Sequence, residues 1–213
     1  MDLTKEVQNV ENIKVVIFDF DDTLYRGNCW ENWGKHVKEF MLSVFKNEQK
    51  VEEVMTKYNI DYRSNGSVIA KATIEEIGSA KKFLEYENTH IYQHDYARLQ
   101  VIQDYEIAAL AKCYPLYIVS NSVIKYIKYH LKNMGINKKH FKKIYQNDFL
   151  VEDMTKTIAY KDILKREKAE PNQVVVIGDS YTNDIEPALK LKMQGIWVQS
   201  LDETREAIMF LTK

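Results

Sequence analysis

Residues 15–24 read Val-Val-Ile-Phe-Asp-Phe-Asp-Asp-Thr-Leu, an apolar run that ends in a cluster of acids. Residues 15–18 are β-branched or aromatic, which predicts a buried strand. Asp19, Asp21 and Asp22 follow within four positions, and alternation along an extended chain places Asp19 and Asp21 on the same side. Carboxylates held this close repel each other, and a hard divalent cation such as Mg2+ relieves the repulsion by binding their oxygens. The end of this strand therefore predicts a metal site and a reaction.

The overall composition is that of an ordinary globular protein. The chain has 213 residues, of which 45% are hydrophobic and 29% are charged. The 30 basic and 31 acidic residues give a net charge of −1. This balance argues against electrostatic capture of nucleic acid or of an anionic membrane.

The termini and the cysteines favour a cytoplasmic protein. The first residues, Met-Asp-Leu-Thr-Lys-Glu, do not form a basic segment followed by an apolar one, so no signal peptide is expected. The apolar runs are too short to span a bilayer. Cys29 and Cys113 are isolated thiols, which fit a reducing compartment better than a disulfide framework. We expect both thiols to be packed in the interior.

Strands and helices alternate over most of the chain. Four further strands are predicted, at residues 116–119, 143–146, 174–177 and 195–198. Helical spacing of apolar residues separates them, and Gly135 is expected to end the helix that follows the second strand. This alternation predicts an α/β fold with a parallel sheet covered on both faces.

One long interval interrupts the alternation. Residues 26–113, between the first and second strands, show apolar stripes at helical spacing throughout. We therefore expect a catalytic core made of residues 1–25 and 114–213 and a helical cap at 26–113. An insert directly after the acidic strand end is placed to act as a lid that excludes water. Within it, Arg26 and the 25–30 stretch either help to select a substrate or serve as hinge and cap anchor.

Two more strand ends carry polar residues. Ser120 and Asn121 follow the second strand, and a hydroxyl with free backbone N–H groups at a helix start can bind an anion, although Ser120 could equally be a plain N-cap. Gly178-Asp179 follows the fourth strand, and Asp184 comes five residues later. Asp184 either returns to the strand end or caps the helix that starts at Ile185.

A lysine between the third and fourth strands completes the set. Lys156 and Lys161 both qualify. Lys156 precedes a helical run and can point back toward the strand ends, whereas Lys161 would lie about one turn inside that helix, so Lys156 is preferred.

Taken in this order, the residues resemble the haloacid dehalogenase superfamily over about residues 13 to 200. The matching motifs are Asp19-Phe20-Asp21-Asp22-Thr23, Ser120, a lysine, and Gly178-Asp179 with Asp184. The resemblance implies a Rossmann-like core of five parallel strands in the order 5-4-1-2-3, which would bring the acids of the first and fourth motifs together. The third motif often reads Lys-Pro. Neither Lys156-Thr157 nor Lys161-Asp162 does, so both lysines stay open.

The resemblance also implies roles for these residues. Asp19 would attack phosphorus, and Asp21 would protonate the leaving oxygen and then activate water. Ser120 and the lysine would hold the phosphate oxygens. Four residues would serve the metal site: Asp19, Asp21 through its backbone carbonyl, Asp179, and Asp184, which would hold a metal-bound water or the lysine. Asp22 and Thr23 would be structural.

These roles predict a Mg2+-dependent phosphatase that forms an aspartyl-phosphate intermediate. A helical lid would favour a small substrate, such as a phosphosugar, a phosphorylated acid or a nucleoside monophosphate. Relatives that dehalogenate lack an acid at the place of Asp21, so C–halogen cleavage is not expected. Phosphomutase relatives usually carry Gly-Val where Asp22-Thr23 stand here. Phosphotransfer to another acceptor, as in a mutase, and a non-catalytic binding protein of the same fold are the alternatives.

Overall fold

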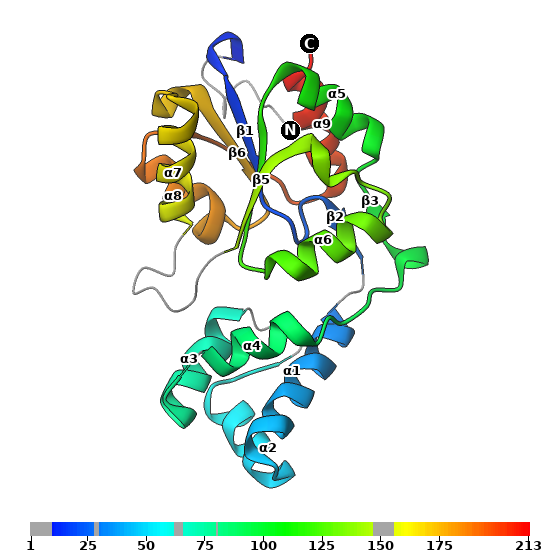
Figure 1. The fold of residues 1–213 in the computed structure, drawn as a ribbon, viewed down its shortest axis with the longest axis vertical. Coiled ribbons are helices and arrows are strands. Elements are labelled where there is room, and N and C mark those ends of the chain that lie inside the picture. The colour runs from blue at the N-terminus through cyan, green and yellow to red at the C-terminus, as the bar shows by residue number, and fades with distance from the viewer. Residues whose placement is uncertain (1–9, 28–29, 62–65, 80, 147–155) are drawn as a thin grey trace. The chain divides into compact units, whose positions relative to one another are not determined.

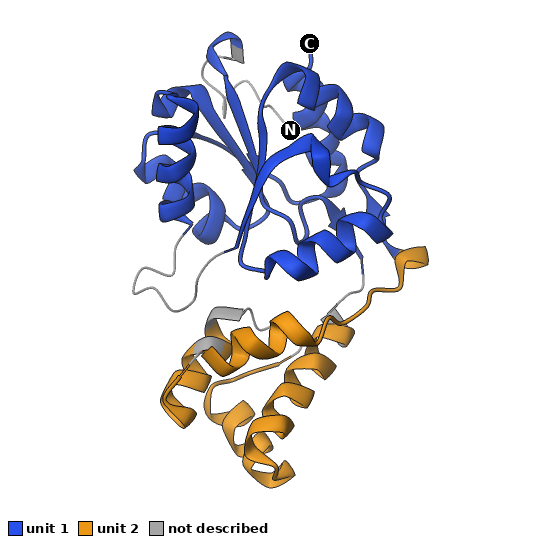
Figure 2. Cartoon of the chain, in the orientation of Figure 1, with its two compact units in different colours: residues 1–27, 99–147, 155–213 blue, residues 28–98, 148–154 orange. Residues whose placement is uncertain are grey.

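The chain forms two compact units. A computed structural model describes residues 10–27, 30–61, 66–79, 81–146 and 156–213 (Figure 1). The first unit comprises Met1–Gly27, Leu99–Asn147 and Thr155–Lys213, and the second comprises Asn28–Arg98 and Asp148–Met154 (Figure 2).

A five-stranded parallel sheet is the centre of the first unit. Its strands are β1 (Val15–Phe18), β4 (Leu116–Ser120), β5 (Phe141–Gln146), β6 (Val174–Gly178) and β7 (Gln194–Trp197). They lie in the order β5-β4-β1-β6-β7, and β1 pairs in parallel with both β4 and β6. Counted along the chain and from the β7 edge, this is the expected order 5-4-1-2-3. The predicted fold is therefore confirmed.

Helices cover both faces of this sheet. The helices of the first unit are α5 (Asp104–Cys113), α6 (Ile124–Asn133), α7 (Thr157–Glu167), α8 (Glu186–Lys190) and α9 (Leu201–Leu211). Helices α7 and α8 lie on one side of the sheet and α5, α6 and α9 on the other (Figure 1). All four residues of β1 are fully buried, because alternate side chains point into the two helical layers. On one of these faces Val15 and Ile17 belong to a core that includes Tyr160 of α7.

The second unit is helical. Its helices are α1 (Trp30–Phe45), α2 (Glu48–Lys57), α3 (Gly66–Ile77) and α4 (Lys81–Thr89). Their apolar stripes form a separate core that contains Trp33, Phe40, Val51, Ile69 and Phe83. The predicted helical insert thus has its own packed interior.

The expected boundary at residue 113 differs from the observed one. Residues 99–113 belong to the first unit, because α5 packs against α9. Helical spacing shows that residues 104–113 form a helix but does not reveal which core that helix joins. Two short strands, β2 (Tyr25–Arg26) and β3 (Gln100–Val101), pair antiparallel and were missed because two residues carry no periodic signal.

Two smaller expectations concern the thiols and the membrane. Cys113 is exposed at the end of α5, so the prediction that it packs in the interior is wrong, whereas Cys29 lies outside the described residues. No helix among the described residues combines the length and hydropathy that a membrane-spanning segment requires.

Candidate active site

Three carboxylates meet where β1 and β6 end. The two strands are parallel neighbours, so their carboxyl ends lie at the same edge of the sheet. Asp19 follows β1, and its N–H donates to the carbonyl of Ile177 at 2.9 Å. Asp179 follows β6, and Asp184 lies in the π-helical turn Tyr181–Ile185. Ligand oxygens of Asp19, Asp179 and Asp184 all lie within 4.8 Å of one another.

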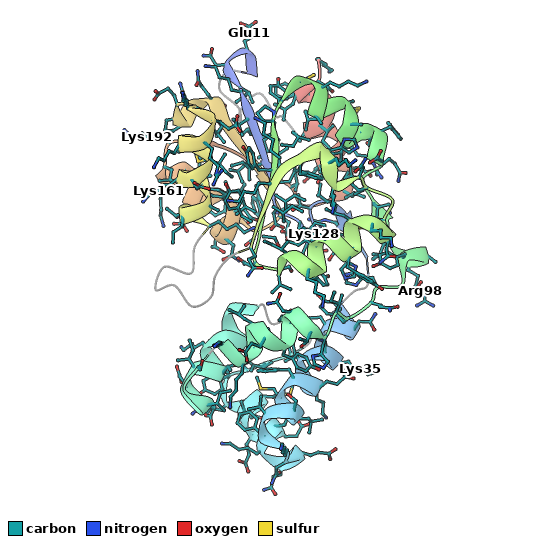
Figure 3. All side chains as sticks on the ribbon, in the orientation of Figure 1. Glu11, Lys35, Arg98, Lys128, Lys161 and Lys192 are labelled. Carbon is teal, nitrogen blue, oxygen red and sulfur yellow. The ribbon has the colours of Figure 1, made fainter. Side chains whose placement is uncertain are left out.

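Lys156 completes this cluster from the start of α7. It is the N-cap residue of that helix and only 3% exposed. Its ammonium donates to Asp19 Oδ1 and, at 2.6 Å, to Asp184 Oδ1. Lys161 is exposed and lies on the outer side of α7 (Figure 3). Of the two lysines left open by the sequence, Lys156 is therefore the one in contact with the acids.

Asp184 is held in one position. Its Oδ2 accepts the N–H of Ser180 at 3.0 Å while Oδ1 accepts from Lys156. Ser180, rather than Asp184, is the N-cap of the following turn. A Cβ on Gly178 would lie 2.5 Å from Asp184 Oδ2, so this close approach requires glycine. Both Asp184 oxygens thus accept hydrogen bonds, and Asp184 is also one of the three carboxylates that could hold a metal ion.

Burial and mutual repulsion disfavour the ionised form of the carboxyl groups in this cluster. Burial raises the pKa of the Asp19 carboxyl well above its ordinary value, the Lys156 ammonium opposes this shift, and the neighbouring carboxylates add to it. Burial, together with the carboxylates of Asp184 and Asp22, raises the pKa of Asp179 to about 7. Burial also disfavours the charged form of Lys156, but Asp184 and Asp19 outweigh it and hold the pKa of Lys156 above its ordinary value. One ammonium does not balance these carboxylates.

A hard divalent cation fits the residues present. Asp19 and Asp179 offer oxygen donors, and burial, with the neighbouring carboxylates adding to it, raises the pKa of both. Among the described residues, Asp19 Oδ2 accepts only a 3.4 Å hydrogen bond from Thr23, so it is the oxygen most available for this purpose.

The carboxylate of Asp21 stands apart from this cluster. Tyr25 donates to Asp21 Oδ1 at 2.5 Å, and Ser122 donates to Oδ2 at 2.6 Å. Ser120 is fully buried, and its hydroxyl accepts the N–H of Ser122 at 3.0 Å and lies 3.4 Å from Asp21 Oδ2. Helix α6 begins at Ile124 with Val123 as its N-cap, so Ser120 is not the cap of that helix.

Asp22, in the first motif, and Arg26, which follows it, have structural roles in the turn after β1. Asp22 has a backbone φ of 54°, a left-handed conformation that shapes the turn. Arg26 donates to the carbonyls of Asp22 at 2.8 Å and Val198 at 3.2 Å, and to that of Gln199. These contacts agree with an anchoring role for Arg26, although its partners lie in the first unit rather than in a cap. Part of the 25–30 stretch lies outside the described residues.

The comparisons with known proteins agree with this geometry. The model of the haloacid dehalogenase-like hydrolase family matches residues 13–191. The chain belongs to this family. The match includes the acids after β1, Ser120, Lys156 and the acids after β6. No curated protein matches the sequence.

Solved structures share the fold of this family member at low identity. The phosphatase from Thermococcus onnurineus is 19% identical with a TM-score of 0.59, over 92% of this chain and 98% of that one. A "predicted phosphoglycolate phosphatase" from Haemophilus somnus 129pt is 18% identical with a TM-score of 0.58, over 88% and 86%. A 2-haloacid dehalogenase from Pseudomonas syringae pv. tomato DC3000 is 18% identical with a TM-score of 0.54, over 87% and 86%. Both chemistries occur on this fold, so the residues must discriminate between them.

The contacts that Tyr25, Ser122 and Tyr126 make around Asp21 were not predicted from the sequence, which gave the 25–30 stretch a different role. Tyr25 contacts Asp21 from four positions later, Ser122 contacts it from the loop after β4, and Tyr126 contacts the Tyr25 hydroxyl at 3.0 Å. The four-residue spacing of Asp21 and Tyr25 was a local signal, since Leu24 N–H bonds the carbonyl of Phe20 in a helical turn. Ser122 and Tyr126 gave no local signal, because they lie about a hundred residues away along the chain.

Proposed function

We propose that this hydrolase is a Mg2+-dependent phosphatase that acts on a small phosphorylated metabolite through an aspartyl-phosphate. The observation that carries the proposal is the buried contact of Lys156 with Asp19 and Asp184, beside a separately held Asp21. Asp19 and Asp21 lie in different environments. Such a difference lets two carboxyl groups in one site perform different tasks. A bound Mg2+ would be held by Asp19 and Asp179, would neutralise charge on the phosphoryl group and would orient it.

In the first step, an oxygen of Asp19 forms a bond to phosphorus. The bond from phosphorus to the leaving oxygen breaks, the electron pair goes to that oxygen, and Asp21 gives it a proton. Lys156 lies against Asp19 and is placed to hold a phosphate oxygen as charge moves outward, and Ser120 is proposed to hold another.

In the second step, water attacks the phosphorus of the aspartyl-phosphate. Asp21, now ionised, takes the proton of the water, and the bond between phosphorus and Asp19 breaks. Inorganic phosphate leaves, and both aspartates return to their starting states. The presence of an acid at position 21 favours phosphoryl transfer over C–halogen cleavage, because a halide leaving group needs no proton.

The helical second unit is proposed to act as the cap. It is inserted between β1 and β4, directly after the loop that carries Asp19 and Asp21, and it has its own apolar core. A lid of this kind excludes water from the reaction and restricts access to small substrates. The leaving group is therefore expected to be a sugar, a small acid or a nucleoside rather than a protein.

The test is release of inorganic phosphate from p-nitrophenyl phosphate and from a panel of phosphorylated metabolites, with Mg2+ or with EDTA. We expect release with Mg2+ and little with EDTA. Asp19→Asn should lower kcat by about a thousandfold or more, because the nucleophile is lost. Asp202→Asn is the matched control, since Asp202 is an exposed acid paired with Arg205 in α9. Absence of phosphate release by the wild-type protein, or full activity of Asp19→Asn, would overturn the proposal. Transfer of the phosphoryl group to another substrate without phosphate release would indicate a phosphotransferase.

A further inference from the structure

We infer that Tyr25 and Ser122 are positioning residues for Asp21, and that Tyr126 holds the Tyr25 hydroxyl in place through a hydrogen bond. This inference rests on the proposed phosphatase function and adds residues that no motif of the chain contains. The hydroxyls of Tyr25 and Ser122 would hold the Asp21 carboxyl in the orientation from which it reaches the leaving oxygen.

The two oxygens of Asp21 are held from opposite segments of the first unit. Tyr25, in β2, donates to Oδ1 at 2.5 Å, and Ser122, in the loop after β4, donates to Oδ2 at 2.6 Å. Ser120 adds a longer contact of 3.4 Å to the same Oδ2. A carboxyl group bonded at both oxygens cannot rotate about its terminal torsion without losing one of these bonds.

The support for Tyr25 is itself buried. Tyr25 is 1% exposed and Tyr126, on α6, is 2% exposed. Their hydroxyl oxygens are 3.0 Å apart. A phenol has one proton, and Tyr25 gives its proton to Asp21, so Tyr126 is the donor of this second bond. The result is a chain of hydrogen bonds from Tyr126 to Tyr25 to Asp21, in which each bond polarises the next.

Aromatic packing fixes the Tyr25 ring independently of its hydroxyl. The Tyr25 ring packs edge-on against Phe20 at 5.3 Å between centroids, and Phe20 packs edge-on against Tyr126 at 6.2 Å. The three rings form one small apolar cluster around the hydroxyl chain. Replacing Tyr25 by phenylalanine should therefore keep the ring packing and remove the hydroxyl, with its contacts to Asp21 and Tyr126.

Asp21 is partly exposed, which explains why it needs this support. Its side chain lies in the turn between β1 and β2, where a carboxyl group without partners would sample several rotamers. A proton donor must lie within hydrogen-bond reach of the leaving oxygen, and misplacement by about 1 Å can cost about a hundredfold in rate. Tyr25 and Ser122 therefore supply orientation, while Asp21 supplies the proton.

The experiment compares two substrates of similar shape whose leaving groups differ in their need for a proton. Phenyl phosphate releases a poor leaving group that depends on protonation, whereas p-nitrophenyl phosphate releases one that depends on it less. We expect Tyr25→Phe to lower kcat/KM by about 10- to 100-fold for phenyl phosphate and by less than about fivefold for p-nitrophenyl phosphate. Because kcat/KM reports the steps up to formation of the aspartyl-phosphate, later hydrolysis does not blur the comparison.

Two further variants and a control complete the set. Ser122→Ala should show the same dependence on the leaving group, and Tyr126→Phe should show it more weakly, because Tyr126 acts through Tyr25. Tyr117→Phe is the matched control: it removes a phenol that also donates to a carboxylate, that of Glu167, in the same unit. It should affect both substrates equally and by less than about twofold.

The outcomes separate the inference from the proposed function. Equal losses on the two substrates in Tyr25→Phe, with unchanged thermal stability, would overturn the positioning role while leaving the phosphatase intact. Full activity of Tyr25→Phe and Ser122→Ala on phenyl phosphate would do the same. Absence of turnover by the wild-type protein on both substrates and on the metabolite panel would overturn the phosphatase proposal and, with it, this inference.

Discussion

Each unit of the molecule buries a contact between a basic and an acidic side chain, and the two contacts differ in the number of carboxylates. In the first unit Lys156 contacts Asp19 and Asp184, and all three side chains are at most 9% exposed. In the second unit His36 Nε2 contacts Glu87 Oε1, with side chains 4% and 10% exposed. The second contact joins one titratable nitrogen to one carboxylate, whereas the first joins one ammonium to two carboxylates, with Asp179 close by.

The surroundings of the two contacts also differ: one is enclosed by aromatic rings and the other lies among polar loops. Aromatic rings enclose His36: its ring stacks on Trp33 at 5.9 Å and lies 5.0 Å from Tyr86 and 4.9 Å from Tyr92. The Lys156 cluster lies instead at a sheet edge, where strands end and polar loops begin. An excess of carboxylates at a sheet edge calls for a further cation, which is the mark of a functional site.

The largest effect should come from removing the cation of the first contact. Lys156→Met leaves Asp19 and Asp184 buried without their ammonium, which we expect to cost about 3–5 kcal/mol of unfolding free energy in metal-free protein. The same change should lower kcat by about a hundredfold or more, because Lys156 lies against the nucleophile. Urea unfolding and phosphate release measure the two effects.

Lys161→Met provides the matched control for this change, since Lys161 lies in the same segment but is exposed. It should alter the unfolding free energy by less than about 0.5 kcal/mol. Unchanged stability and activity in Lys156→Met would show that its contact with the acids contributes nothing, and the comparison of the two units would fail.

The two contacts could be predicted from the sequence to different degrees. The Lys156 cluster could be predicted, because Asp19 and Asp179 directly follow apolar strands, Asp184 comes five residues after Asp179, and parallel strands bring such ends together. The choice between Lys156 and Lys161 needed the structure, since both lie near the start of the same helix. The contact of His36 with Glu87 could not be predicted, because the two residues lie 51 positions apart along the chain.

Some of the strands and helices could likewise be predicted from the sequence, and others could not. The buried strands β1, β4 and β6 were predicted from β-branched runs, and Gly135, with φ of 76°, follows the end of α6 as expected. The assignment of α5 to the first unit could not be predicted, because its apolar stripe fits either core. The hydroxyls that hold Asp21 come from separate segments, so only tertiary structure brings them together.

A smaller effect should follow from breaking the contact in the second unit. Glu87→Leu removes the carboxylate that His36 contacts, and we expect a loss of about 2–3 kcal/mol in unfolding free energy. The double variant His36→Phe/Glu87→Leu should recover most of this loss, because apolar side chains of similar volume suit the aromatic surroundings. Turnover of p-nitrophenyl phosphate per folded molecule should stay within about threefold in both variants. Urea unfolding followed by tryptophan fluorescence reports on this unit through Trp33.

Glu52→Leu is the control for this experiment. Glu52 pairs with Lys38 at 2.9 Å, but the two side chains are 62% and 47% exposed. Removal of this exposed pair should lower the unfolding free energy much less than Glu87→Leu does, because solvent screens the pair. If Glu87→Leu abolished turnover as strongly as Lys156→Met while the unit stayed folded, the division into a structural and a functional contact would be wrong.

The smallest effect concerns pH and metal, and it tests the charge excess directly. The folded pKa of Asp179 is raised to about 7 by burial and by the carboxylates of Asp184 and Asp22. A carboxyl whose pKa is raised on folding binds its proton more tightly in the folded state, so it favours folding at low pH. That contribution is lost as the pH rises from the ordinary value of 3.8 through about 7. In EDTA, the wild-type protein should therefore lose unfolding free energy, relative to Asp179→Asn, by up to about 1 kcal/mol per pH unit between pH 5 and 7.

Saturating Mg2+ should remove or reverse this difference, because the cation takes the place of the proton. Urea unfolding at each pH, with EDTA or Mg2+, gives the four curves. Parallel curves for the wild type and Asp179→Asn would mean that the charge of the cluster is already balanced without a metal ion.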